Sequence, residues 1–333
     1  MTLKMPAEWE KHERTWMSWP PNNYLLGESD EEAELTRTTW ANVANAIAKY
    51  EPVTVLATTD QLEIARNYLH PSIEIVEAEL NDAWLRDNGP TFAKSENGEI
   101  VAVNWIFNGW GNQSWASFDK DQLTASFIGK LTGSEVVNSK LINEGGGIHV
   151  NGAGVVLLTE TVQLGEGRNS SWSKQEVEAE IHAKLGTSKA IWVKRGLTRD
   201  YDGFGTRGHI DIVACFASEN VILYHDQQDP AHPDFEVSKE VRATLEAAGD
   251  YELVAVPAPT ILRDDEGFVD YSYINHYIVN GAVILCSFDD PNDEVAKKIM
   301  ERVYPGREIV LVDARQIFAN GGGIHCITQQ QPA

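Results

Sequence analysis

An internal repeat is the feature of this sequence that most limits its fold. The segment EGGGIHVNGAGVVLLTE, from Glu144, returns in part as NGGGIHCITQQ, from Asn320. Looser relatives with the same strand, turn, strand pattern begin at Asp87, Gly208 and Tyr273. The chain therefore contains five related units. Repetition of this kind indicates repeated supersecondary modules rather than an open doubly wound sheet.

Helical and extended patterns alternate along the chain. Amphipathic segments lie at 29–50, 60–69, 119–132, 173–185, 236–248 and 291–303. Two of them open with capping boxes, Ser29 with Glu32 and Ser173 with Glu176. Between the helices, PVTVLA, AIWVK, YELVAV and EIVLV predict strands. We expect an α/β fold of five ββαβ modules around a pseudo-fivefold axis. No linker marks a boundary, so residues 1–333 are predicted to form one domain.

The composition of the chain limits which binding partners and which cellular location are expected. A formal charge of -23 repels phosphate backbones and attracts small cations, so we expect no nucleic-acid partner. The N-terminus lacks a signal pattern and no apolar run has the roughly 20 residues of a membrane helix, which predicts a cytoplasmic protein with no membrane partner. Three cysteines without Cys-x-x-Cys spacing predict free thiols. The sequence leaves a homo-oligomer open.

The three cysteines have different surroundings. Cys215 and Cys286 lie within apolar strand patterns, where a thiol behaves as a small hydrophobic side chain. Cys326 follows three glycines, from Gly321 to Gly323, which let the backbone approach a ligand closely. We therefore expect its thiol to be accessible. A third buried strand cysteine is the alternative.

His209 and Asp211 stand two residues apart in GHIDIVACF. At the beginning of a strand both side chains would project from one face, where a charged group needs a partner or a function. A strand-end histidine bonded to its neighbouring acid is the structural alternative. No third ligand stands at a recognisable spacing, so we predict no metal site. His149 and His325 occupy similar places in two repeats and are expected to have architectural duties.

Two further acids stand at the beginning of repeat units. Asp87 follows Trp84 in WLRDNGP, and a carboxylate beside a bulky aromatic ring suits a flat cation that stacks while its N–H groups are bonded. An ion pair between Arg86 and Asp87 is the competing interpretation. Glu144 precedes three glycines and is either an inward-facing carboxylate or a turn-capping residue.

These residue types fit hydrolysis of a guanidinium group. The group is planar, delocalised and charged near neutral pH, so paired carboxylates suit its bidentate hydrogen bonds. A thiolate can attack the central carbon. A histidine can protonate the departing ammonia and then activate water against the thiouronium intermediate. No metal or organic cofactor is required. Either a cationic histidine or the bound substrate must stabilise the thiolate.

Blocks in order along nearly the whole chain resemble the agmatine deiminases of the peptidylarginine deiminase-like, guanidino-group-modifying superfamily. They are MPAEW, HERTWMSWP, WLRDNGP, EGGGIHVNG, GHID and GGGIHCITQQ. The resemblance implies a five-bladed α/β propeller, or pentein, with a central site. It also implies Cys326 as nucleophile, His209 as acid/base, Asp87 and Asp211 as guanidinium-binding groups, and a supporting role for Glu144.

The implied activity is a deiminase that converts agmatine to N-carbamoylputrescine and ammonia, or that acts on a related guanidine, with no cofactor. Further predicted substrate contacts are Trp84, Trp9, Gly323 and Arg207. An amidinotransferase or an arginine or methylarginine hydrolase of the same superfamily is an alternative. So is a non-catalytic guanidinium- or polyamine-binding protein.

The chain departs from the family pattern in two places. Gly323 runs directly into Ile324, where these enzymes generally have an asparagine. The approach to GHID, usually acidic and short, here reads RDYDGFGTR. Arg207 would repel a distal ammonium, so the sequence predicts a guanidine with a neutral, aromatic or acidic tail in preference to agmatine.

Overall fold

A computed structural model describes residues 2–333 of the chain. Its strands are β1 (Leu3–Lys4), β2 (His12–Ser18), β3 (Val53–Ala57), β4 (Glu74–Glu77), β5 (Thr91–Ser95), β6 (Ile100–Ile106), β7 (Glu135–Ile142), β8 (Ile148–Val150), β9 (Val155–Thr159), β10 (Lys189–Val193), β11 (Ala214–Ser218), β12 (Val221–Asp226), β13 (Glu252–Pro257), β14 (Arg263–Asp264), β15 (Gly267–Phe268), β16 (Tyr277–Val279), β17 (Ala282–Ser287), β18 (Glu308–Asp313) and β19 (Thr328–Pro332).

The α-helices are α1 (Asp30–Ile47), α2 (Leu62–Tyr68), α3 (Leu85–Asn88), α4 (Gly109–Asn112), α5 (Thr124–Leu131), α6 (Glu160–Gln163), α7 (Lys174–Leu185), α8 (Asp234–Ala248), α9 (Asn292–Val303) and α10 (Arg315–Ala319). Short 3-10 helices are η1 (Tyr24–Leu26), η2 (Thr59–Gln61), η3 (Asp121–Leu123), η4 (Gly145–Gly147), η5 (Thr198–Tyr201) and η6 (Ile210–Ile212). Within the described part of the chain, no helix has both the length and the apolar character that crossing a bilayer requires.

Five sheets share one order of elements, which makes the fold α/β as predicted. Two antiparallel strands are followed by a helix and by a third strand, which pairs in parallel with the second. Four of these units are β5–β6–α5–β7, β8–β9–α7–β10, β11–β12–α8–β13 and β16–β17–α9–β18. In the fifth, the C-terminal strand β19 pairs with β2 of the N-terminal β2–α1–β3 segment. The units match the repeats in the sequence.

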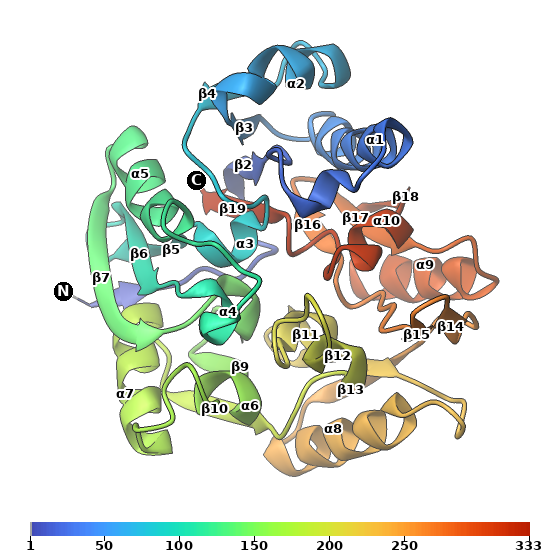
Figure 1. Ribbon diagram of the computed structural model, residues 1–333. Helices are drawn as coiled ribbons and strands as arrows, with labels where there is room; N and C mark the ends of the chain where they lie inside the picture. Colours follow the sequence, from blue (N-terminus) through green and yellow to red (C-terminus); the bar gives the residue numbers. More distant parts are fainter. Residues whose placement is uncertain (1) are drawn as a thin grey trace.

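The arrangement of these sheets brings distant segments together. Figure 1 shows them around a common centre, with β5, β11, β16 and β19 on the inner side and helices such as α7 and α8 on the outside. The pairing of β19 with β2 joins the two ends of the chain. Residues just before the inner strands therefore reach the same central region.

Local capping explains where two of the helices begin. The Ser29 hydroxyl accepts a hydrogen bond from the Glu32 N–H at 3.2 Å, and the Glu32 carboxylate accepts one from the Ser29 N–H at 3.0 Å. Ser173 and Glu176 make the same reciprocal pair at the beginning of α7. Both predicted capping boxes are confirmed, and the predicted helices and strands are found within a few residues of their expected ends.

The prediction that His209 and Asp211 lie on one face of a strand is wrong. Both precede β11, and Asp211 lies within the 3-10 turn Ile210–Ile212. The Asp200 carboxylate accepts hydrogen bonds from the backbone N–H groups of Gly208 at 2.6 Å and His209 at 3.1 Å. Because these amides are satisfied by a side chain, the segment turns instead of joining the sheet ladder.

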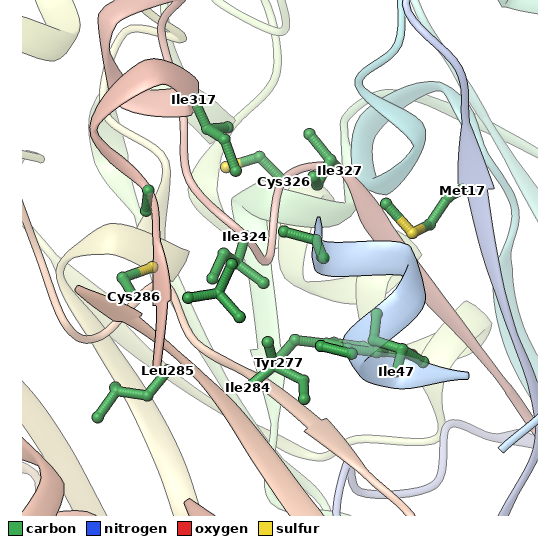
Figure 2. Packing of buried hydrophobic residues seen from close by; sticks show 14 of the residues in the cluster. Met17, Ile47, Tyr277, Ile284, Leu285, Cys286, Ile317, Ile324, Cys326 and Ile327 are labelled. Carbon is green, nitrogen blue, oxygen red and sulfur yellow. The ribbon is translucent and has the colours of Figure 1, made fainter. Parts of the chain in front are cut away.

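The segment that carries Cys326 is anchored in the largest hydrophobic cluster. Ile324 and Ile327 are fully buried on either side of it, and Ile317 of α10 belongs to the same cluster. Figure 2 shows Cys326 between Ile317 and Ile327, with Cys286 of β17 nearby. Dense packing fixes this turn in place, because displacing it would open a cavity in the core.

Candidate active site

Five buried side chains from four repeat units meet at the centre of the molecule, and none is more than 4% exposed. They are Asp87 of α3, Glu144 before η4, His209 before η6, Asp211 of η6 and Cys326 before β19. His209 Nδ1 lies 3.7 Å from Asp87 Oδ1, and His209 Nε2 lies 3.3 Å from Glu144 Oε2. Cys326 Sγ lies 3.6 Å from Asp211 Oδ2. The structure thus brings together the predicted catalytic residues.

Two glycines permit this close approach. The Gly146 N–H donates to Asp87 Oδ1 at 3.0 Å, and a Cβ at this position would lie 2.4 Å from His209 Nδ1. A Cβ on Gly322 would lie 3.1 Å from Cys326 Sγ and 2.8 Å from the Trp84 ring. Any side chain at either position would collide with the site.

His209 is held as a cation. Burial alone would lower its pKa, but Asp87, Glu144 and Asp211 outweigh burial and raise the pKa to about 9. Glu144 is itself held as a carboxylate, because Arg168 Nε donates to its two oxygens at 3.0 and 3.1 Å. Burial opposes ionisation of Glu144, yet Arg168 and His209 lower its pKa. Glu144 is therefore an inward-facing carboxylate, with no capping hydrogen bond to η4.

Asp211 is the end of a chain of buried polar groups. His325 Nδ1 lies 2.8 Å from Asp211 Oδ2, and His325 Nε2 lies 2.9 Å from Glu8 Oε1. Burial raises the pKa of Asp211, but His325 outweighs it, and the net shift is downward. The His325 ring thus adjoins the site, which goes beyond the architectural role expected from the sequence.

The Cys326 thiol is enclosed rather than accessible, so that expectation is wrong for this structure. The side chain is 4% exposed because Trp84, Asn275 and the turn before it pack around the sulfur. Asn275 Nδ2 donates to Cys326 Sγ at 3.3 Å. Burial, followed by the charges of Asp211 and Asp87, raises the pKa of Cys326 well above its usual value. The free protein therefore holds this residue as a thiol.

Two buried polar atoms at the site have no hydrogen-bond partner among residues 2–333. They are Asp211 Oδ1 and His209 Nδ1. An unsatisfied buried group costs about 1–3 kcal/mol, so native proteins usually avoid one. These two atoms are thus available to bond something other than the described chain itself.

Trp84 and Gly323, two of the predicted substrate contacts, lie beside Cys326. The Trp84 indole N–H donates to Tyr24 Oη at 2.9 Å, which fixes the ring beside Gly322. A Cβ on Gly323 would lie 2.4 Å from Asn275 Oδ1, the side chain that also bonds Cys326. These contacts explain why small residues precede the cysteine.

Arg86 does not pair with Asp87, so that competing interpretation is wrong. Its guanidinium donates to Gln330 Oε1 at 2.8 Å and lies 3.5 Å from Glu8 Oε1. The Asp87 carboxylate instead accepts a hydrogen bond from the Trp110 indole N–H at 2.8 Å. Trp110 itself adopts a left-handed backbone conformation with φ 55°.

Two other predicted substrate contacts lie apart from the five central side chains. Trp9 packs against two hydrophobic clusters, and its carbonyl oxygen accepts from Arg307 at 2.6 Å. The Arg207 guanidinium donates to the Tyr201 carbonyl oxygen and lines an open cavity that also contains Glu166. None of the five central side chains lines that cavity.

Several residues at the site were not singled out from the sequence as functional. They are Asn275, His325, Trp110, Arg168 and Glu8. In the described chain we find no group of three or more histidine, cysteine or acidic side chains arranged to hold a metal ion.

The sequence matches the profile of the Porphyromonas-type peptidyl-arginine deiminase family over residues 4–332. The chain belongs to this family. A putative agmatine deiminase from Streptomyces avermitilis is 57% identical over 99% of this chain and 97% of that protein. The agmatine deiminase of Pseudomonas aeruginosa is 37% identical over 99% of this chain and 96% of that protein.

A solved structure supports the same conclusion. The agmatine deiminase of Enterococcus faecalis superimposes with a TM-score of 0.91 and 30% identity, covering 99% of this chain and 96% of that one. The family predicted from the sequence blocks is confirmed, and so is the predicted reaction class of the family, hydrolysis of a carbon–nitrogen bond in a linear amidine.

Proposed function

We propose that this protein is an agmatine deiminase that converts agmatine and water to N-carbamoylputrescine and ammonia. The observation that carries the proposal is the convergence of the Cys326 thiol, the cationic His209 and the carboxylates of Asp87 and Asp211 in one buried site. Each group has a distinct task in hydrolysis of a guanidinium. The relatives named agmatine deiminase support the choice of substrate.

Binding begins with the two carboxylates. Asp211 Oδ1 is buried without a partner and so is available to accept a hydrogen bond from a guanidinium N–H. Asp87 accepts from the Trp110 indole and the Gly146 N–H, which orient its carboxylate beside His209. Together the carboxylates match the charge of a planar guanidinium, and they hold its carbon near the sulfur.

Substrate binding also prepares the nucleophile. In the free enzyme, burial and the charges of Asp211 and Asp87 disfavour the Cys326 thiolate. A bound guanidinium offsets both negative charges, so it lowers the cost of ionising the thiol, whose proton passes to solvent because His209 is already protonated. Of the two ways to stabilise the thiolate, the structure thus favours assistance by the substrate, with His209 adding its own positive charge.

His209 serves first as a proton donor and then as a proton acceptor in the chemical steps. The Cys326 thiolate forms a bond to the guanidinium carbon, and His209 protonates the departing nitrogen, so that ammonia leaves and a thiouronium adduct remains. Neutral His209 next takes a proton from water as the water oxygen bonds to the same carbon. Cleavage of the carbon–sulfur bond releases the carbamoyl product, and the proton of its hydroxyl group passes to the sulfur, which restores the Cys326 thiol. Glu144 keeps the imidazole oriented through both proton transfers.

Ammonia release from a panel of guanidino compounds tests this function. We expect agmatine to give by far the highest kcat/KM, above arginine and methylarginines. Intact-mass measurement after an acid quench should detect the Cys326 adduct. A preference for arginine or methylarginine, or amidino transfer to an added amine, would contradict the proposal.

Matched cysteine variants separate chemistry from folding. Cys326→Ala should abolish turnover while retaining agmatine binding. Cys215→Ala removes an equally buried thiol from β11 and should retain activity. Turnover by Cys326→Ala at the wild-type rate would eliminate covalent catalysis and would favour a different chemistry.

We also propose that the five related sheets are blades of one pseudo-symmetric propeller and that residues 1–333 act as a single catalytic domain. Three features support this. The blades share one element order, β19 closes the ring onto β2, and residues that precede the inner strands meet at the centre.

A further inference from the structure

A carboxylate without a partner lies in a cavity next to the nucleophile segment. The cavity has a volume of about 230 Å³ and is lined by Asp270, Phe204, Phe318 and Gly321, among other residues. No hydrogen bond or ion pair from another residue in 2–333 reaches the Asp270 carboxylate. The Asp270 carboxylate is therefore available to accept a hydrogen bond from a ligand in the cavity.

The wall of this cavity continues directly into the active site. Gly321 has φ 108°, and a Cβ there would lie 2.9 Å from the Phe204 carbonyl oxygen. The next residue is Gly322, whose Cβ would lie 3.1 Å from Cys326 Sγ. The Phe318 ring comes within 2.8 Å of the position of a Cβ on Gly323. Gly321 therefore borders the cavity, and its neighbour Gly322 borders the Cys326 thiol.

The nearby cation does not neutralise Asp270. Arg199 lines the same cavity, but its guanidinium donates to Asp264 Oδ2 at 2.7 Å, to Glu266 Oε2 at 2.8 Å and to the Phe268 carbonyl oxygen. Burial first, and then the charge of a second acid, raise the pKa of Asp270 to about 7 against the opposing effect of this arginine. A ligand cation would favour the ionised form.

We propose that Asp270 binds the distal ammonium of the substrate and so makes the enzyme selective for a guanidine with a cationic tail. This inference rests on the proposed deiminase function. The butyl chain of agmatine links the guanidinium at Cys326 to an ammonium in the cavity, and Phe204 and Phe318 provide apolar and aromatic walls for them.

Two other acids line the cavity but are less suitable. Asp202 is exposed on the loop before Phe204, and the Glu266 side chain is 80% exposed and already bonds Arg199. Solvent screens exposed charges, so each would contribute little to binding an ammonium. Asp270 is half-buried, and so its interaction with a cation is screened less.

Asp270→Asn tests the proposal with two substrates, agmatine and butylguanidine, which lacks the ammonium. For agmatine we expect KM to rise about tenfold to a hundredfold with kcat nearly unchanged, because a charge-assisted hydrogen bond is lost. For butylguanidine we expect no change in KM. Asp265→Asn removes the same charge from an exposed position outside the cavity and should behave as wild type.

The outcomes separate this inference from the proposed function. If the wild type prefers agmatine but Asp270→Asn changes the two KM values equally or not at all, only the Asp270 assignment is wrong. A larger effect from Asp202→Asn would also overturn it. If the wild type does not hydrolyse agmatine, both proposals fail. Asp270→Ser repeats the test should the asparagine variant not fold, as judged by its thermal unfolding.

Discussion

Glu144→Gln should shift the pH dependence of turnover, because Glu144 holds His209 in its cationic form. Its carboxylate is fully buried and lies 3.3 Å from His209 Nε2. Arg168 keeps that carboxylate ionised, so the glutamine variant removes a full negative charge with almost no change of shape. The imidazolium then keeps the charges of Asp87 and Asp211 but loses that of Glu144, which helps to stabilise it against burial.

The size of the shift follows from the lost interaction. A hydrogen bond to a charged group contributes about 1.5–3 kcal/mol, which makes the His209 cation about tenfold to a hundredfold less stable relative to neutral imidazole. The pKa of His209 is raised to about 9 in the wild type. His209 must be protonated when ammonia leaves, so the alkaline limb of kcat/KM, which reports the free enzyme, should move from near pH 9 to about pH 7–8.

Ammonia release at agmatine concentrations well below KM, between about pH 6 and pH 10, measures this limb, since the pH profile of kcat/KM reports groups in the free enzyme. Glu160→Gln is the matched control, because it removes the same charge from an exposed ion pair with Lys174. If the alkaline limb lay at the same pH in Glu144→Gln and wild type, the conclusion that Glu144 keeps His209 protonated would be refuted.

Three more variants probe the surroundings of the site. Trp110→Phe removes the indole donor to Asp87, whose pKa burial raises to about 6, so KM for agmatine should rise more at pH 6 than at pH 8. His325→Gln removes the imidazole that keeps Asp211 ionised, and KM should increase about tenfold, whereas a purely structural effect would appear in the unfolding temperature alone. Burial and a neighbouring carboxylate raise the pKa of Asp82 to about 8, so the folded state holds a proton that the unfolded state has released, and stability falls as pH rises. Asp82→Asn should lose about 2 kcal/mol less than wild type between about pH 6 and pH 8 in chemical denaturation.

The fold could be predicted where local patterns decide structure. The capping boxes at Ser29 and Ser173 depend on residues three apart, and the repeat units encode their own strands and helices. The GHID segment could not be predicted in the same way. Its turn depends on the buried Asp200 carboxylate, which bonds the amides of Gly208 and His209 across a loop. Nothing in the residues of the segment itself indicates that partner.

The site was predictable to the extent that the repeat places its residues. Asp87, Glu144 and Cys326 stand near the beginning of different units, so a common centre brings them together. Asn275 has a weak signal of this kind, because it is a polar residue within the apolar pattern YINHYIV near the beginning of a unit. Arg168 has none. It lies in the loop between α6 and α7 and reaches Glu144 only through the folded chain.

Specificity for the substrate tail shows most clearly why proximity in sequence misleads. Arg207 is two residues from His209, yet its backbone is left-handed, with φ 73°, and its guanidinium is bonded to the Tyr201 carbonyl oxygen. The electrostatic effect of Arg207 on a ligand depends on their distance in space. Its position next to GHID in the sequence therefore does not predict which substrate tail the enzyme prefers. Asp270 lies between β15 and β16 and shares a cavity with Gly321, close in sequence to Cys326. The residues that select the tail follow from the lining of that cavity, which only the folded chain defines.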